Sequence, residues 1–352
     1  MATFIDTSSG AAKILFQADN IEAAERDNVF GAITGGAEAP VYRVRGLEGK
    51  RSGYTKKGIV IYTQDPTAGS TGFNATEVDK EEDISPTLES LTLDNHEKGF
   101  DLGFVAEGQY NILDFMKDHR VIAQRWHADK IEGGRTGFTG LVDNLLSSPT
   151  TRFYGGVGNA NTAVSGLAAG DILTYNKLVE MSANLKAGVA QNGTSTFLKF
   201  RKANFLGFSQ KYVCIANPLT YSSLKQSSDW KTIQANAQKR GKDNILFNGL
   251  FDQFVIGEVD GIVLLESDRV PTFASGETVD AAAAAVAGGR CILMGAQAAL
   301  YGTGMTRKPV IGFPRDESKT YIYYYFIKAS KATAPGGTTF GSATCDVALA
   351  AS

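Results

Sequence analysis

The clearest series of apolar runs separated by polar caps and turns lies between residues 211 and 271. Three short apolar runs there have the length and β-branched content of buried strands: 212–216, 254–256 and 262–265. After the first run, Asn217 and Pro218 predict a helix over 219–226, because Asn caps free N–H groups and Pro is tolerated at the first helical position. Asp260-Gly261 predicts a hairpin between the last two runs. The segment is therefore predicted to be a small α/β unit.

The longest helical pattern runs from Asn111, a possible cap, to Ile131, and Gly133-Gly134 ends it. One stripe at helical spacing is mostly apolar: Ile112, Phe115, Met116, His119, Ile122, Ala123 and Trp126. The other side is polar: Lys117, Arg120, Gln124, Arg125 and His127. A single apolar stripe on a long helix predicts that the helix lies on a sheet, with its polar side solvated.

Weaker patterns predict the remaining elements. Two further helices each have a cap and a Gly stop: one runs from Asp171 or Thr174 to Gly188, the other from Asp229 to Gly241. The Ala-rich residues 280–289 predict either a short helix or a surface insertion, and strands are predicted at 291–294 and 321–327. Residues 1–45 are polar, with a possible short helix up to Phe30, and carry too little apolar surface to close a core.

A projecting hairpin is predicted between residues 54 and 93, from strands at 58–62 and 88–93. One arm is basic, with Lys50, Arg51, Lys56 and Lys57. The other is acidic, with Glu77, Asp79, Glu81, Glu82 and Asp83. Two interpretations stay open: the charges cover solvated faces, or they meet the opposite patch of a neighbouring molecule. A lone two-stranded ribbon is marginally stable in water, so the hairpin needs a surface to lie on.

Composition narrows the class of protein. The 352 residues can bury a substantial core, and a net charge of −2 gives no bulk attraction to nucleic acid. No apolar run approaches the roughly 20 residues that span a bilayer, so no membrane partner is expected. Cys214 and Cys291 lie in apolar runs and are predicted to be buried thiols. We expect a protein made in a reducing cytoplasm.

No set of residues with catalytic spacing is present in the sequence. The three histidines, His96, His119 and His127, are not placed as metal ligands on adjacent helical turns. The sequence has no Gly-x-Ser-x-Gly, no Gly-rich loop ending in Gly-Lys-Ser/Thr and no Cys-x-x-Cys. We therefore expect no enzyme, no cofactor and no metal site.

Several elements, in order, resemble the major coat proteins of tailed bacteriophages, in the branch related to the coat protein of coliphage N-four. The matching residues are Ala216-Asn217-Pro218, Leu224, Trp230, Gln234, Phe247-Asn248-Gly249-Leu250, Asp260-Gly261-Ile262-Val263, Glu266-Ser267 and 293–298. The resemblance implies an α+β, Hong Kong 97-like capsid fold. Its expected parts are an N-terminal arm (1–45), an extended β-hairpin loop with flanking strands (46–99), a peripheral domain with a long spine helix (100–165), an axial α/β domain (166–289) and a return to the peripheral domain (290–352).

The resemblance also implies a function. The chain would assemble with itself, as hexamers and pentamers, into an icosahedral shell around a phage genome, with the nine charged residues of the hairpin as candidate inter-subunit contacts. Expected partners are scaffold, portal and decoration proteins, and packaged DNA held on the inner surface without sequence specificity. Assembly would take place in the host cytoplasm. The alternatives are another virion protein, such as a decoration or tail component, or an α/β enzyme with an unrecognised site.

Overall fold

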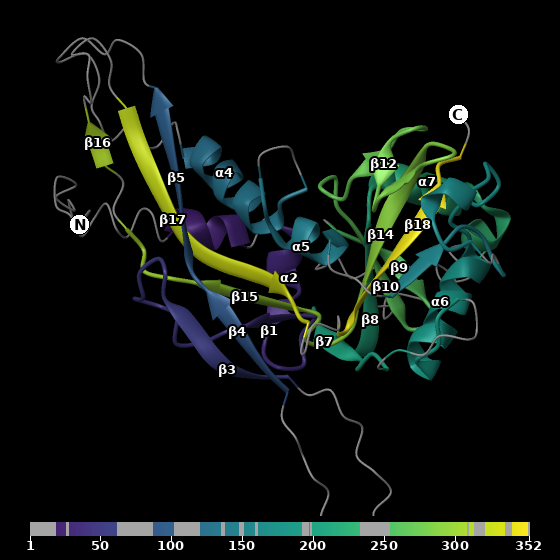
Figure 1. Cartoon of the computed structure of the whole chain (residues 1–352), viewed down its shortest axis with the longest axis horizontal. Helices are drawn as coiled ribbons and strands as arrows, with labels where there is room; N and C mark the ends of the chain where they lie inside the picture. The colour runs from purple at the N-terminus through teal and green to yellow at the C-terminus, as the bar shows by residue number, and fades with distance from the viewer. Residues whose placement is uncertain are drawn as a thin grey trace, which may run out of the picture.

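The computed structural model shows two large β-sheets side by side, joined by helices (Figure 1), and two smaller two-stranded sheets. It describes residues 19–25, 28–61, 87–101, 120–134, 138–147, 151–158, 161–191, 197, 199–232, 254–307, 310–312, 321–334 and 340–350. Strand-rich sheets with few helices among these residues give a mixed α+β fold, as expected.

The first sheet has 6 strands and is built around the long strand β17. Its strands are β1 (Thr34–Gly35), β2 (Val41–Arg43), β5 (Asp94–Asp101), β15 (Ala299–Thr303), β16 (Val310–Gly312) and β17 (Tyr321–Ala332). β15 and β16 pair with one edge of β17 and β5 pairs with the other, all antiparallel. The predicted strand at 321–327 is therefore confirmed and is longer than expected.

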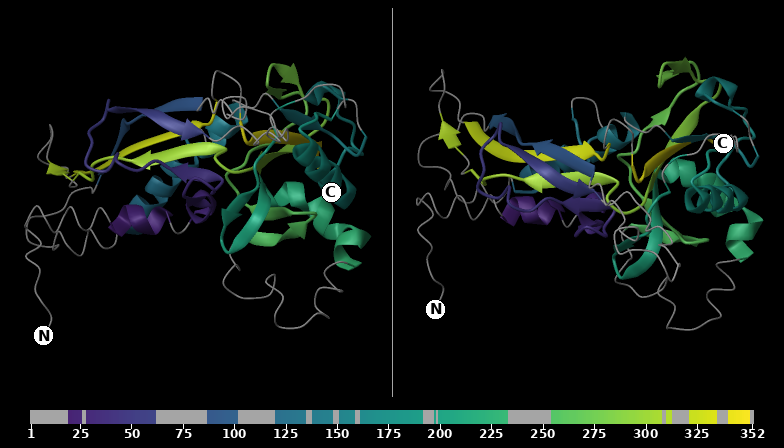
Figure 2. Two further views of the ribbon diagram at one scale, coloured as in Figure 1. Left: turned by 90° about the horizontal axis from the view of Figure 1, so that it is seen from below. Right: turned by 60° about the horizontal axis from the view of Figure 1, so that its bottom comes forward.

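A two-stranded ribbon, which we define as β3 (Thr55–Ile61) and β4 (Thr87–Thr92), lies on one face of the first sheet. Figure 2 shows helices α2 (Val29–Ala32) and α4 (Arg120–Glu132) on the opposite face. The antiparallel pairing of β3 with β4 confirms the two strands of the predicted hairpin, whose tip lies outside the described residues.

The second sheet has 8 strands, in the order β6-β18-β14-β8-β10-β9, with β7 and β11 at its margins. The strands are β6 (Arg152–Tyr154), β7 (Ala203–Phe205), β8 (Phe208–Ala216), β9 (Val255–Val259), β10 (Ile262–Glu266), β11 (Thr272–Phe273), β14 (Gly288–Met294) and β18 (Ser342–Ala348). Helices α6 (Tyr175–Ala187) and α7 (Pro218–Gln226) contribute to the apolar cluster on one face, and α5 (Leu141–Ser147) packs on the other. This sheet draws on residues 152–154 and 342–348, which lie outside the range expected for the axial domain.

The α/β unit predicted at 211–271 is confirmed in its main parts. The Asn217 side chain accepts a hydrogen bond from the Leu219 N–H, and Pro218 opens α7. β9 and β10 form the predicted hairpin, with φ of 44° at Asp260 and 84° at Gly261. β10 also pairs in parallel with β8. Because Gly261 has a positive φ, a side chain at that position would strain the turn.

The long helix differs from its expected pattern. Helix α4 begins at Arg120 among the described residues, and the expected start at Asn111 lies outside them. Ile122 was expected in the buried stripe and is 46% exposed, whereas His127, expected on the polar side, is fully buried. His127 packs on Phe326 of β17, with ring centroids 5.1 Å apart. The helix is thus rotated so that Trp126 and His127 face the core together.

Four local expectations have clear outcomes. Thr174, not Asp171, caps α6, and Gly188 ends it in the left-handed conformation. Ser227, not Asp229, accepts from the Trp230 N–H at the start of the helical turn 228–232. The Ala-rich segment does not form the short helix that was one of its two predicted outcomes; with the residues just before it, it forms a small hairpin, β12 (Thr278–Val279) with β13 (Ala282–Ala283). Cys214 and Cys291 are free and buried, as predicted.

Residues 28–44 belong to the core, which corrects the expectation that residues 1–45 have too little apolar surface to close one. Val29, Phe30, Ile33 and Val41 are buried in a large cluster with α4, α5 and both sheets. Helix α2 and strand β2 are too short to show a repeating pattern of apolar residues, so the sequence alone does not reveal that these side chains are buried. One apolar core thus connects the two halves of the molecule.

Candidate functional site

The inner face of the ribbon is apolar and closes a small core against the first sheet. Ile59, Ile61, Leu91 and Leu93 are buried with Leu300 of β15 and Ile327 of β17. This contact supplies the surface that an isolated two-stranded ribbon lacks. A bulge between Lys56 and Ile59 shifts the register of the two strands, and Gly58 within it has a φ of 74°.

Polar contacts fix the direction of the ribbon. The buried Glu89 carboxylate accepts from the Lys331 amine at 2.6 Å and from the Ala334 N–H at 2.9 Å, both at the end of β17. The Gln297 side-chain amide donates to the Val60 carbonyl at 3.3 Å. Because these contacts lie near Ile61 and Thr87, they hold the last described residues of both strands in place.

The outer face of the ribbon exposes large apolar side chains. Val60 and Leu88 are directly opposite each other across the strand pair and are 38% and 57% exposed. Tyr54, next to β3, is 41% exposed. Sequence reasoning missed these residues, although strand alternation gives the signal: Val60 lies between the buried Ile59 and Ile61 and has to face the other side.

The four basic candidate residues lie at the start of the ribbon, and three are fully available on the surface. Lys50, Arg51 and Lys57 are exposed, with the Lys50 amine 5.1 Å from the centre of the Tyr54 ring. Lys56 is half-buried and donates to the Arg45 carbonyl within its own chain. The acidic candidates Glu77, Asp79, Glu81, Glu82 and Asp83 lie outside the described residues. The pairing of the two arms therefore stays a prediction.

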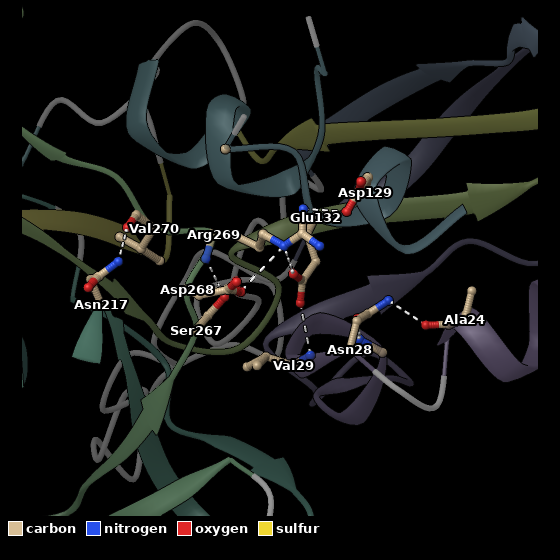
Figure 3. Close-up of polar contacts among 12 residues, drawn as sticks. Ala24, Asn28, Val29, Asp129, Glu132, Asn217, Ser267, Asp268, Arg269 and Val270 are labelled. Atoms are coloured by element: carbon tan, nitrogen blue, oxygen red, sulfur yellow. Dashed lines mark hydrogen bonds and ion pairs between the residues drawn. The ribbon is translucent and has the colours of Figure 1, made fainter. Parts of the chain in front are cut away.

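A second site, which we call the joint, connects the two sheets through Arg269 (Figure 3). The loop 267–270 follows β10 of the second sheet, and its Arg269 forms ion pairs with Asp129 and, at 3.7 Å, with Glu132 near the end of α4. The other carboxylate oxygen of Glu132 accepts from the Val29 N–H of α2 at 3.0 Å. The joint thus holds three segments that are distant in sequence.

The loop of the joint is also fastened to its own sheet. The Asn217 side chain donates to the Val270 carbonyl at 3.0 Å, and the Arg269 N–H donates to the Ser267 hydroxyl at 3.2 Å. Gly134, at φ 74°, lies so close that a Cβ there would be 1.9 Å from the Arg269 carbonyl oxygen. This close approach requires glycine after α4.

Electrostatics at the joint are unusual because carboxylates outnumber cations. Burial raises the pKa of Glu132 from its ordinary 4.5 to about 7, although the Val29 N–H and the Arg269 guanidinium both favour the ionised form. Nothing in the sequence pairs Glu132 with Arg269. The position of Glu132 is a weak indication of such a partner, because an acidic residue at a helix C-terminus interacts unfavourably with the helix dipole unless a nearby cation or N–H group stabilises it.

Within the described ranges, neither a metal-binding cluster nor a membrane-spanning helix is found. No group of three or more His, Cys, Asp or Glu side chains is arranged to hold a metal ion. No helix among these residues is long and apolar enough to cross a membrane.

Comparisons with known proteins point in one direction. A family model described as phage capsid protein matches residues 26–323. Solved structures similar to this chain include the capsid of Ralstonia phage GP4, with a TM-score of 0.64 and 18% identity over 92% of this chain and 91% of that one. The head of Helicobacter pylori bacteriophage KHP40 gives a TM-score of 0.61 and 14% identity, covering 92% and 91%. The cyanophage Pam1 capsid gives 0.59 and 16%, covering 93% of both chains. No curated protein sequence matches significantly.

Proposed function

The chain belongs to the phage capsid protein family, and from that premise we propose how its copies associate. It is a major capsid protein with the Hong Kong 97-like fold, and its place is the shell of the virion. We propose that the ribbon is the main contact with a neighbouring copy. The observation that carries this proposal is the exposed pair Val60 and Leu88 on a ribbon whose direction is fixed by Glu89.

An exposed apolar pair on a fixed ribbon suits a contact between copies. Monomeric proteins rarely retain large apolar side chains side by side on an outer strand face, because such surfaces promote association. Lys50, Arg51 and Lys57 add exposed positive charge at the start of the same ribbon. We propose that they meet the acidic segment that contains Glu77, Asp79, Glu81, Glu82 and Asp83 on the next copy. Each contact can be weak, since a closed shell repeats it many times.

Further proposals follow from the family. The shell is icosahedral, built from hexamers and pentamers in the host cytoplasm around DNA that is held without sequence specificity. Scaffold, portal and decoration proteins are the expected partners, and the chain acts by association and not as an enzyme. Within the family we place it near the coat protein of coliphage N-four, on the residues from Ala216 to Ala298 that resemble it. The five-part division of the chain remains a proposal as well.

The test replaces Lys50, Arg51 and Lys57 together with Glu in the full-length chain. We expect a folded protein, with a melting temperature within about 2 °C of wild type because exposed charges contribute little to stability. Shells should be lost in negative-stain electron microscopy and analytical ultracentrifugation under conditions in which the wild type assembles. The control replaces two exposed lysines away from the ribbon, Lys199 and Lys231, with Glu and should still assemble. Normal shells from the triple variant would refute the charged contact.

A further inference from the structure

The joint brings together one cation and two carboxylates that are largely shielded from solvent. The side chains of Arg269, Asp129 and Glu132 are 13%, 14% and 7% exposed. If both carboxylates were ionised, the cluster would carry one uncompensated negative charge in a poorly solvated place. Burying an unpaired charge is costly, so one of the two carboxyl groups is expected to hold a proton over part of the accessible pH range.

Glu132 is the group that takes the proton. Asp129 contacts the guanidinium directly, whereas the nearer Glu132 oxygen is 3.7 Å from the Arg269 Nε, beyond hydrogen-bonding distance. Glu132 is also the last residue of α4, where the helix dipole disfavours a negative charge. Its other oxygen accepts from the Val29 N–H, and a neutral carboxyl can keep that hydrogen bond.

Charged groups from each neighbouring element support this assignment. From α4, Asp129 repels the Glu132 carboxylate; from the loop, Arg269 attracts it and Asp268, 69% exposed, repels it weakly. From α5, Asp143 accepts from the Gly134 and Gly140 N–H groups just beyond the end of α4. Helix α2, residues Val29–Ala32, has no charged side chain and offers Glu132 only a backbone N–H.

We propose that the joint is a proton-dependent clamp: protonated Glu132 lets the loop 267–270 and α2 close on the end of α4, and its ionisation favours their local opening. The clamp is therefore tightest in acidic solution and loosens as the pH rises toward neutrality. This inference concerns a single folded chain and does not depend on the proposed contacts between copies. It makes the attachment between the two sheets sensitive to pH near neutrality.

The direction of the effect follows from linkage. Burial raises the pKa of Glu132 to about 7 in the closed joint, and an opened, solvated Glu132 returns toward its ordinary 4.5. The closed form thus binds a proton that the open form releases between these two values. Between these two values each further pH unit favours opening by up to about tenfold, and above the upper value both forms are ionised and the balance between them no longer changes with pH.

Hydrogen exchange on the full-length protein tests the clamp. Exchange of peptides covering 28–34 and 267–271 is measured by mass spectrometry at pH 6.0 and 8.5 and divided by the intrinsic rate at each pH. We expect the corrected rate in wild type to rise about tenfold at pH 8.5. A peptide from β8, residues 212–216, should not change. A rise of less than about twofold at the joint in wild type overturns the proposal by itself.

Two variants separate the clamp from a general loss of structure at high pH. Glu132→Gln is neutral at every pH and keeps an oxygen for the Val29 N–H, so it should exchange slowly at both pH values. Asp129→Asn removes a carboxylate that raises the pKa of Glu132, so the rise should move to lower pH and shrink between pH 6.0 and 8.5, because Glu132 then pairs with Arg269 without that repulsion. Glu266→Gln, which removes a carboxylate from the Lys225 ion pair on the same sheet, is the matched control and should behave as wild type. An unaltered pH response in Glu132→Gln contradicts the proposal.

Discussion

The second sheet and the ribbon differ in where their apolar residues are covered. Every residue of β14 and β18 is buried, and apolar clusters lie on both faces of that sheet. The ribbon buries only its inner face, and Val60 and Leu88 remain exposed on the outer one. One region completes its burial within the chain, whereas the other presents an apolar surface outward. A shell protein needs both, since a stable body has to carry surfaces whose burial waits for assembly.

Two Leu→Ala substitutions, one in each region, should give the largest difference in stability between the second sheet and the ribbon. Leu264 in β10 is fully buried, and its replacement with Ala removes packing and leaves a cavity, so unfolding should become easier by about 3–4 kcal/mol. Leu88→Ala on the ribbon should cost less than about 0.5 kcal/mol and should reduce shell formation instead. Denaturant unfolding measures the first effect and sedimentation the second. Equal destabilisation by both substitutions would mean that the ribbon is covered in the single chain.

Two glycines test the place where the halves meet. Gly134→Ala puts a Cβ 1.9 Å from the Arg269 carbonyl oxygen at φ 74°, so backbone strain and a clash add together. We expect a loss of about 3 kcal/mol. Gly261→Ala has a similar φ of 84° with no atom within 4 Å, so only the conformational strain of about 1 kcal/mol should remain. Thermal unfolding of both variants gives the difference, and a Gly134 variant as mild as the Gly261 one would show that the joint adapts easily.

Local signals in the sequence were sufficient for the unit of β8, α7, β9 and β10 in the second sheet and insufficient for β18 and for the joint. Asn217-Pro218 and Asp260-Gly261 act through their own backbone neighbours, so a short window contains all the required information. The contact between Glu132 and Arg269 joins residues far apart in sequence, and only the folded chain brings them together. The prediction of the buried face of α4 was wrong for a related reason. That face was assigned from the polarity of the side chains, but His127 is buried against Phe326 of β17.

The buried face of the first sheet should respond to acid. Burial lowers the pKa of His127 from 6.5 to about 4, although its ring nitrogen contacts the Ala123 carbonyl at 2.6 Å. The unfolded chain binds a proton at pH values where the folded one does not, so stability should fall as the pH drops from 6.5 toward 4. His127→Phe keeps an aromatic ring beside Phe326 and removes this acid-dependent loss of stability, which amounts to roughly 2 kcal/mol at pH 4.5. Melting curves at pH 6.5 and 4.5 check it; the same acid sensitivity in the variant would assign the loss to other groups.

A substitution on the ribbon that hardly changes stability should still reduce assembly. Glu89→Ala removes the contacts of the ribbon with Lys331 and the Ala334 N–H, and because the Lys331 side chain is 44% exposed, the cost should be only about 1 kcal/mol. Glu266→Ala removes a comparable ion pair, with Lys225 at 2.8 Å, on the second sheet and should cost the same or less. The two variants should therefore melt alike, yet only Glu89→Ala releases the direction of the ribbon and should lower the yield of shells in sedimentation and electron microscopy. Our proposal makes assembly depend on how Val60 and Leu88 are presented and not only on whether the chain is folded, so equal yields from both variants would place the main subunit contact elsewhere on the molecule.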